Sequence, residues 1–300
     1  MQNRLKNILE GIEGVSVVKS PPFSKLTTIG TGGEAAALLI PLSLDGLRGA
    51  LKAISVEEIP YFIFGGGSNI LVPDEGIDQV SLSLKQSLSR VSFNGSGVVV
   101  EAGTALPRLS VLAAVSGLSG LEELSGIPGS VGGAVMMNAG SFGRNICELI
   151  RWLEIMDREG RVCRFKGGDI QYAYRQTVIP VEGVVSRLYL ELQRGVKERI
   201  FASMRKMNRM RKMKQPWGAK TFGSVFKNPK GGYAGKLIEE AGLSGLRIGD
   251  AEVSKKHANF IINRGKAKSR DIDSLIKYME KKVREENGIA LEREVRYVGW

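Results

Sequence analysis

Residues 126–140 are the stretch that most constrains the fold of this chain. They read G-I-P-G-S-V-G-G-A-V-M-M-N-A-G, with glycines interleaved among small or apolar residues. Glycine in an ordered segment costs conformational entropy, so this density indicates a backbone that turns tightly or approaches another group closely. The apolar residues indicate burial and not a flexible linker. Peptide N–H groups in such a turn suit phosphate oxygens, although a tight core turn without a ligand has the same signature.

A second glycine-rich turn follows a predicted strand. Residues 61–64, Tyr-Phe-Ile-Phe, form the short apolar run that is typical of a buried strand. They lead directly into Gly65-Gly66-Gly67-Ser68-Asn69, which offers bare amides and two side-chain donors. The Lys-Ser/Thr ending of a nucleotide-triphosphatase loop is missing. Two such turns predict one diphosphate cofactor held between them.

A third glycine pattern, G-T-G-G-E-A at residues 30–35, has the spacing of a dinucleotide fingerprint. That fingerprint requires a buried strand immediately before it and a helix immediately after it. Residues 20–25 are mostly polar, and Pro21 and Pro22 interrupt them. The sequence therefore argues against a Rossmann fold.

Composition narrows the class of protein. With 300 residues, 43% of them hydrophobic and 25% charged, the chain is typical of a soluble protein of two or three domains. No apolar run approaches the ~20 residues that span a bilayer, and the charged N-terminus is unlike a signal peptide. Cys147, Cys163 and the single His257 argue against a zinc site or a disulfide framework and fit a reducing cytoplasm. The net charge of +12 predicts an anionic partner, either nucleic acid or a phosphorylated small molecule.

Hydrophobic periodicity predicts the remaining elements. Helices are expected over residues 5–12, 45–54, from Pro107 to 113, 234–242 and 271–288. Strands are expected at residues 98–101, within 151–194 and at 291–300. The stretch 199–220 has eight basic residues and no acidic one, with apolar residues at approximate helical spacing. Such a helix usually presents a solvated face, but it could also attract phosphates or nucleic acid.

Eight segments, spread from residue 26 to residue 298, occur in one characteristic order. They are Leu26-Thr27-Thr28 with Gly32-Gly33, Gly65 to Leu71, Gly126 to Gly140, Tyr174-Arg175, Gly223 to Pro229, Ala234 to Gly242, His257 to Asn263, and Leu291 to Val298. In this order they resemble the UDP-N-acetylenolpyruvoylglucosamine reductases, the flavoenzymes of bacterial peptidoglycan precursor synthesis. Each segment is a weak signal alone, but together they make the resemblance specific.

The resemblance implies an α+β fold. It is a vanillyl-alcohol-oxidase-type FAD-binding fold, in which two α+β subdomains surround FAD, plus a C-terminal α+β substrate-binding domain. Composition shifts near residues 60 and 200 place the two FAD-binding subdomains at residues 1–59 and 60–198. The substrate-binding domain is then expected at residues 199–300, with a terminal strand that could return to the FAD-binding part.

The resemblance also implies the reaction. NADPH reduces FAD and leaves, and UDP-N-acetyl-enolpyruvoylglucosamine then receives a hydride from flavin N5 and a proton, giving UDP-N-acetylmuramate. Ser224 is the implied proton donor, while Arg175 and Glu294 stabilise the enol-type intermediate at the substrate carboxylate. A fixed guanidinium suits that developing charge, and a carboxylic acid of raised pKa could share a proton. A serine is a very weak acid, so the role of Ser224 rests on the resemblance.

FAD is expected to be non-covalent, because no histidine precedes His257. Its expected contacts are Gly65, Gly66, Gly67, Ser68, Asn69, Ile127, Pro128, Gly129, Ser130, Gly132, Gly133, Ala134, Asn138, Ala139 and Gly140. The expected substrate contacts are Tyr174, Lys227 and Asn228, with help from the basic stretch for the diphosphate. No metal is expected. We expect a cytoplasmic monomer without a nucleic-acid or membrane partner.

Two features set this chain apart within the family. Thr177 stands where the family commonly has a serine, which keeps the hydroxyl. Residues 181–192 lack the long tyrosine-bearing insertion of some members, so the chain resembles the shorter subtype.

Two other classes of protein remain as alternatives. An oxidase of a small alcohol on the same fold would not explain why Ser224, Arg175 and Glu294 occur together in their family contexts. A nucleic-acid-binding protein that uses residues 199–220 would bind polyanions with a strong salt dependence, but it leaves both glycine-rich turns unexplained.

Overall fold

The computed structural model describes residues 11–85 and 87–300, and the chain forms two compact units whose segments alternate along the sequence. Unit 1 contains residues 36–66 and 78–209 together with the described residues up to Ser20. Unit 2 contains residues 21–35, 67–77 and 210–300. The division predicted at residues 59/60 and 198/199 assumed that each domain is one continuous stretch of sequence. Such a division does not describe alternating segments, and it stays a prediction.

Unit 1 contains a four-stranded sheet of order β1-β2-β5-β3. Its strands are β1 (Val15–Lys19), β2 (Ala35–Pro41), β3 (Tyr61–Phe64) and β5 (Ile77–Ser83), with β3 parallel to β5 and β1 antiparallel to β2. Helix α3 (Leu44–Val56) buries the apolar face predicted for it, formed by Leu47, Ala50, Leu51 and Ile54. Ser43 begins this helix by accepting a hydrogen bond from the N–H of Gly46 (3.0 Å).

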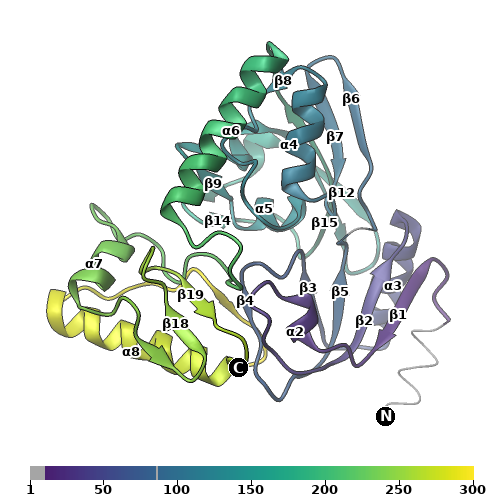
Figure 1. The fold of residues 1–300 in the computed structure, drawn as a ribbon. Helices are drawn as coiled ribbons and strands as arrows, with labels where there is room; N and C mark the ends of the chain where they lie inside the picture. The colour runs from purple at the N-terminus through teal and green to yellow at the C-terminus, as the bar shows by residue number, and fades with distance from the viewer. Residues whose placement is uncertain (1–10, 86) are drawn as a thin grey trace. The chain divides into compact units, whose positions relative to one another are not determined.

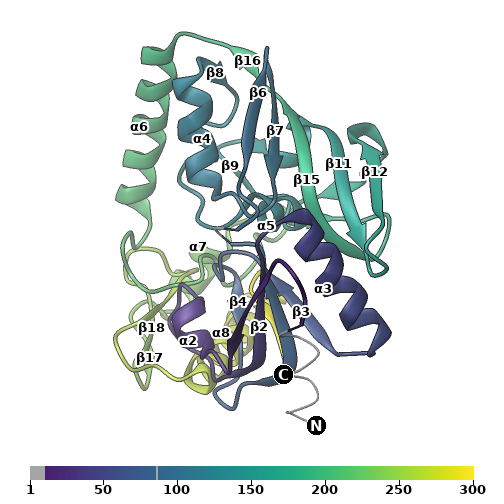
Figure 2. The same cartoon turned by 90° about the vertical axis from the view of Figure 1, so that its right-hand side faces the viewer.

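The second sheet of unit 1 has five antiparallel strands in the order β12-β11-β15-β7-β6 (Figure 2). These are β6 (Val91–Asn94), β7 (Gly97–Glu101), β11 (Ile150–Asp157), β12 (Val162–Lys166) and β15 (Gly183–Glu191). Helix α4 (Leu106–Val115) packs beside helix α6 (Lys197–Lys214) through Ala114, Ile200 and Met204. The predicted start at Pro107 is confirmed, because Pro107 lies in the first turn of α4.

Short elements complete unit 1. They are β8 (Leu118–Ser119) paired with β16 (Gln193–Arg194), α5 (Val131–Met136), β9 (Gly140–Ser141) paired with β10 (Arg144–Asn145), the 3-10 helices η1 (Ile146–Leu149) and η2 (Gly167–Asp169), and the hairpin of β13 (Tyr172–Ala173) and β14 (Gln176–Thr177).

Unit 2 has its own apolar core around helix α8 (Ser269–Asn287), which lies beside the sheet β17-β18-β19 and helix α7 (Ala234–Glu240) (Figure 1). The three strands are Arg247–Ile248, Ala251–Val253 and Ile261–Asn263. The remaining elements are α2 (Phe23–Leu26), β4 (Ile70–Leu71) and β20 (Arg296–Tyr297), and β4 pairs with β20 in parallel. The predicted end of α8 is confirmed: Gly288 adopts a left-handed conformation with φ +68°.

Three expectations from the sequence have different outcomes. The strand expected at residues 291–300 is wrong in extent, because only Arg296–Tyr297 joins a ladder. Residues 30–35 lead into strand β2 and not into a helix, so a Rossmann fingerprint is excluded. Most of the helix expected at residues 5–12 lies outside the described residues.

None of the helices in residues 11–85 and 87–300 is long and apolar enough to cross a bilayer.

A buried carboxylate joins three neighbouring strands of the five-stranded sheet. Glu154 on β11 is 2% exposed and accepts hydrogen bonds from Arg164 on β12 and from Arg187 on β15, each at 2.6 Å. Burial by itself raises the pKa of the Glu154 carboxyl, but the hydrogen bonds and charges of the two arginines outweigh it and keep the pKa below its ordinary value. Ionised Glu154 therefore stabilises the folded state.

We expect Glu154→Gln to lower the free energy of unfolding at neutral pH by about 2 kcal/mol, because the amide cannot accept from both arginines. The folded-state pKa lies below the unfolded one, so the stabilisation is complete above the unfolded pKa and is lost as the pH falls through the folded pKa. Urea unfolding should show the difference between wild type and variant shrinking below about pH 4.3. A difference that does not change with pH would contradict this account.

Candidate active site

The two glycine-rich turns meet in unit 1. A Cβ atom on Gly66 would lie 2.8 Å from the Cα of Gly129, and one on Gly65 would overlap the Oγ of Ser130. The two backbones therefore touch at positions that tolerate no side chain. Helix α5 follows at once, and the Oγ of Ser130 accepts a hydrogen bond from the N–H of Gly133 (3.2 Å).

Several amides at this contact are unused. The N–H groups of Gly65, Gly66 and Gly129 have no acceptor among the described residues, and these glycines are only half-buried. The N–H of Gly132, by contrast, donates to the carbonyl of Ala102 at the end of β7 (2.8 Å). Bare amides at a junction of two turns fit the oxygens of a diphosphate, so this part of unit 1 suits the predicted cofactor. Gly132 packs α5 against the sheet.

The continuation of the first turn belongs to unit 2. The carbonyl of Gly67 accepts a hydrogen bond from the N–H of Thr28 (2.9 Å). The Nδ2 of Asn69 donates to the carbonyl of Glu294 (3.0 Å), and the N–H of Arg296 donates to the carbonyl of Asn69 (3.0 Å). The side-chain donor expected at the cofactor thus fixes the segment that carries Glu294.

Ser224 and Glu294 lie on two adjoining extended segments of unit 2. The carbonyl of Val225 accepts hydrogen bonds from the N–H of Glu294 (2.8 Å) and from that of Val295 (3.3 Å). Two residues opposite one is the pattern of a β-bulge, which redirects side chains and is common beside active sites. Ser224 is half-buried, and its hydroxyl has no hydrogen-bond partner among residues 11–85 and 87–300.

Asn259 also fixes the Ser224 segment, a role that the sequence analysis missed. Its Oδ1 accepts from the N–H of Phe226 (3.0 Å), its Nδ2 donates to the carbonyl of Phe226 (2.8 Å), and its own carbonyl accepts from the N–H of Val225 (2.9 Å). Asn259 is 3% exposed. An asparagine inside the apolar run 258–262 was the one available signal, because a buried amide needs partners.

Tyr174 and Arg175 form the two-residue turn between β13 and β14 in unit 1. Arg175 has φ +58°, a left-handed conformation that residues other than glycine rarely adopt and that often marks functional sites. Its guanidinium carbon lies 5.0 Å from the centroid of the Tyr174 ring. Of the three predicted catalytic residues, Ser224 and Glu294 lie on adjoining segments of unit 2, and Arg175 is part of unit 1.

The expected substrate contacts Lys227 and Asn228 both bind other parts of unit 2. The Nζ of Lys227 forms an ion pair with the Oε1 of Glu292 (2.6 Å). The Oδ1 of Asn228 accepts a hydrogen bond from the N–H of Ala234 at the start of α7 (3.1 Å). Because Glu292 is exposed, its pair with Lys227 contributes little to stability.

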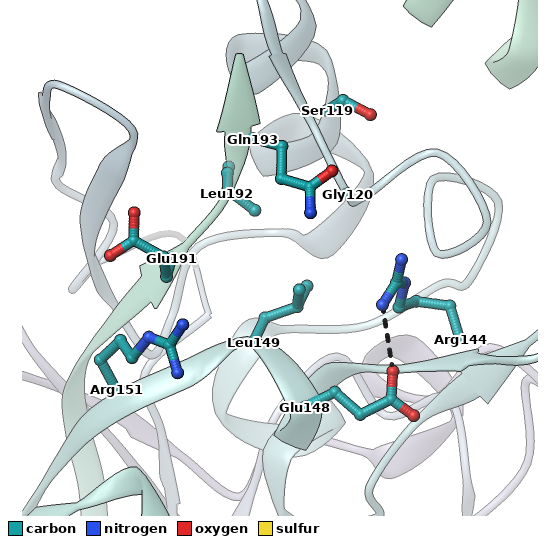
Figure 3. A pocket seen from close by; sticks show the side chains of 9 residues that line it. All are labelled: Ser119, Gly120, Arg144, Glu148, Leu149, Arg151, Glu191, Leu192 and Gln193. Carbon is teal, nitrogen blue, oxygen red and sulfur yellow. Dashed lines mark hydrogen bonds and ion pairs between the residues drawn. The ribbon is translucent and has the colours of Figure 1, made fainter. Parts of the chain in front are cut away.

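A pocket of about 170 Å³ in unit 1 contains none of the predicted site residues. In Figure 3, Arg144 is paired with Glu148 (3.3 Å), and Arg151 and Glu191 line the other side. The two arginines and two glutamates that line this pocket balance in charge. No group of three or more His, Cys, Asp or Glu residues that could hold a metal ion occurs in the described part of the chain.

Comparison with known families defines the class of protein. Residues 35–166 match the FAD binding domain, and this range contains both glycine-rich turns and every residue expected to contact FAD. Residues 215–298 match the C-terminal domain of UDP-N-acetylenolpyruvoylglucosamine reductase. The protein is an FAD-dependent oxidoreductase.

Individual relatives identify the family. The UDP-N-acetylenolpyruvoylglucosamine reductase of Caldanaerobacter subterraneus subsp. tengcongensis is 39% identical over 298 residues, which cover 99% of this chain and 97% of the relative. The reductase of Clostridium novyi is 41% identical over 97% of this chain and 95% of its own. The crystal structure of the enzyme (MurB) from Thermus caldophilus superimposes with a TM-score of 0.82 at 38% identity, covering 94% of this chain and 98% of that one.

The chain belongs to the UDP-N-acetylenolpyruvoylglucosamine reductase family. The resemblance inferred from its eight sequence segments is thereby confirmed. The predicted FAD-binding α+β fold with a C-terminal α+β domain, and FAD as the cofactor, are confirmed by the same matches.

We expect Gly66→Ala to weaken FAD binding by at least about tenfold, because the new methyl group must push the two turns apart. Gly168→Ala is the matched control, since no atom lies within 4 Å of a Cβ at that position. Fluorescence titration of the deflavinated proteins with FAD measures both affinities. Wild-type affinity in Gly66→Ala, with an unchanged melting temperature, would show that the turn contact does not shape the cofactor site.

Proposed function

We propose that the protein reduces UDP-N-acetylenolpyruvoylglucosamine to UDP-N-acetylmuramate in the cytoplasm, as a step of peptidoglycan precursor synthesis, with NADPH as the electron source. The observation that supports this most strongly is the likeness to named reductases over nearly the whole chain, at 39% and 41% identity. FAD, when bound, would supply the hydride-transfer chemistry that links oxidation of NADPH to reduction of the enolpyruvyl double bond.

The reaction requires two things of the protein itself. Addition of a hydride to the terminal carbon of the double bond leaves an electron pair on the neighbouring carbon, and the adjacent carboxylate delocalises it. A proton must then be delivered to that carbon. The protein therefore has to stabilise negative charge at a carboxylate and to supply one proton.

Ser224 is the proposed proton donor. Its hydroxyl is half-buried and engaged by no described residue, so its proton is available to a ligand. A hydroxyl is a weak acid, but the carbanion-like centre that it protonates is a much stronger base, which drives the proton transfer. Glu294, held beside Val225 by the bulge, is proposed to stabilise the same enol-type intermediate.

Arg175 is the proposed partner of the substrate carboxylate. A planar guanidinium offers two parallel donors to a carboxylate and keeps its charge at any working pH. The strained backbone of Arg175 supports the proposal, because strain at a turn persists where the surrounding structure imposes it. Tyr174, Lys227 and Asn228 are proposed as further substrate contacts.

Visible absorption spectra test the proposed function. The purified protein should be yellow, should bleach on anaerobic addition of NADPH, and should regain its colour with UDP-N-acetylenolpyruvoylglucosamine. A protein that bleaches and stays bleached would instead use another acceptor on the same fold. A colourless protein that FAD cannot reconstitute would contradict the assignment of both glycine-rich turns.

We expect Ser224→Ala to leave the rate of flavin reduction by NADPH unchanged and to slow reduction of the enolpyruvyl substrate by about 10²–10⁴-fold, the usual contribution of a general acid. Stopped-flow measurement of the two half-reactions separates these effects. Ser244→Ala, at an exposed serine of the same unit, is the control. Normal substrate reduction by Ser224→Ala would remove this residue from the mechanism.

We expect Arg175→Lys to slow the same half-reaction by about 10²-fold, because an ammonium cannot replace a guanidinium that binds a carboxylate with two hydrogen bonds. Arg194→Lys, at an exposed arginine of unit 1, controls for the change of cation. Single-turnover measurements with pre-reduced enzyme report the step directly. Rates near those of wild type would show that Arg175 has a structural role and does not stabilise the substrate carboxylate.

A further inference from the structure

The hairpin that carries Arg175 is too small to be rigid by itself. Strands β13 and β14 contribute two residue pairs, Tyr172 with Thr177 and Ala173 with Gln176. Residues 171–174 and 176 are exposed, so little apolar surface holds the hairpin in place. Isolated two-stranded hairpins are at best marginally stable in water. The position of Arg175, whose left-handed backbone adds strain, must therefore depend on anchors outside the hairpin.

Two side chains supply such anchors, one on each arm. On the outgoing arm the hydroxyl of Thr177 donates to the carbonyl of Val135 in helix α5 (2.5 Å). On the incoming arm the Nδ2 of Asn138, just beyond α5, donates to the carbonyl of Ala173 (2.9 Å). Thr177 is 8% exposed, the one residue of the hairpin that is buried. A hydrogen bond that is shielded from water constrains geometry more strongly than one on the surface.

The surroundings of Thr177 keep this contact in one arrangement. The Sγ of Cys147 lies 3.4 Å from its Oγ1, and the N–H of Cys147 donates to the Oδ1 of Asn138 (3.4 Å). Burial raises the pKa of the Cys147 thiol, and it outweighs the opposing hydrogen bond with Thr177, so the thiol stays protonated and neutral. Thr177, Cys147 and Asn138 thus form one buried polar cluster between α5 and the hairpin.

Helix α5 also begins at the contact between the two glycine-rich turns, since its first residue follows Ser130. Its N-terminal end therefore meets the predicted FAD site, and its C-terminal end holds the hairpin. We propose that Thr177 is a positioning residue: its hydroxyl ties the Arg175 turn to α5 and thereby holds the guanidinium where the substrate carboxylate binds. This rests on the proposed function of Arg175.

The matched variants are Thr177→Val, which removes the hydroxyl at nearly constant shape, and Thr177→Ser, which keeps it. The fold should tolerate valine, because the carbonyl of Val135 also accepts the N–H of Asn138 (2.9 Å) and is not left without a partner. Hydrogen–deuterium exchange of the FAD-loaded protein then reports the anchor without any substrate. Amide exchange over residues 171–178 should rise by about tenfold in Thr177→Val and stay at the wild-type rate in Thr177→Ser. Unchanged exchange in the valine variant would overturn the proposal.

The half-reactions test whether the anchor acts through Arg175. Thr177→Val should slow substrate reduction by about tenfold, with flavin reduction by NADPH and FAD affinity unaltered, and Thr177→Ser should restore the rate. In an Arg175→Ala background, Thr177→Val should have no further effect, because contributions that act through one group are not additive. Independent effects of the two substitutions, or equal slowing of both half-reactions, would contradict the positioning role. A wild-type protein that never reduces the enolpyruvyl substrate would refute the proposed function, while the exchange experiment would still decide whether Thr177 anchors the hairpin.

Discussion

The contact between the turns at Gly66 and Gly129 is the constraint on which the rest of unit 1 depends. A side chain at Gly65 or Gly66 would collide with the second turn, and this close approach explains the glycines at both positions. The same contact sets the start of α5, which packs through Gly132 on Ala102. The close approach also leaves three amides without acceptors among the described residues, so the geometry that satisfies packing creates a site for anionic oxygen.

In unit 2 the equivalent constraint is a set of asparagine amides. Asn259 pairs with both main-chain groups of Phe226, and Asn69 holds the carbonyl of Glu294. A side-chain amide carries a donor and an acceptor at the spacing of a peptide group, so it can replace a missing strand neighbour. Residues 224–226 and 293–295 can therefore follow irregular paths, including a bulge, and remain fixed.

Much of this architecture could be predicted from the sequence, because the determining interactions are local. The inward face of α3, the strand at residues 61–64 and the glycine that ends α8 follow from periodicity and backbone preference. The prediction of a strand over residues 291–300 was wrong in extent, because the length of a strand depends on the partner with which it pairs. Only Arg296 and Tyr297 pair with β4. The structural roles of Asn259, Asn69 and Asn228 could not be predicted from the sequence, since each depends on contacts that the sequence pattern does not show. The sequence alone does not show whether a polar side chain binds a ligand or a carbonyl group of its own chain.

The alternation of the two units along the chain has a consequence for how the protein is made. Unit 2 takes residues 21–35 and 67–77 from the early part of the chain, yet β4 is completed by pairing in parallel with β20, at Ile70 with Arg296 and Leu71 with Tyr297. The indole N–H of Trp300 also donates to the carbonyl of Leu71 (3.1 Å). During synthesis these early segments emerge from the ribosome long before the residues that complete them. The order of translation therefore cannot be the order of folding, and unit 2 closes only once the residues around 296 have been added.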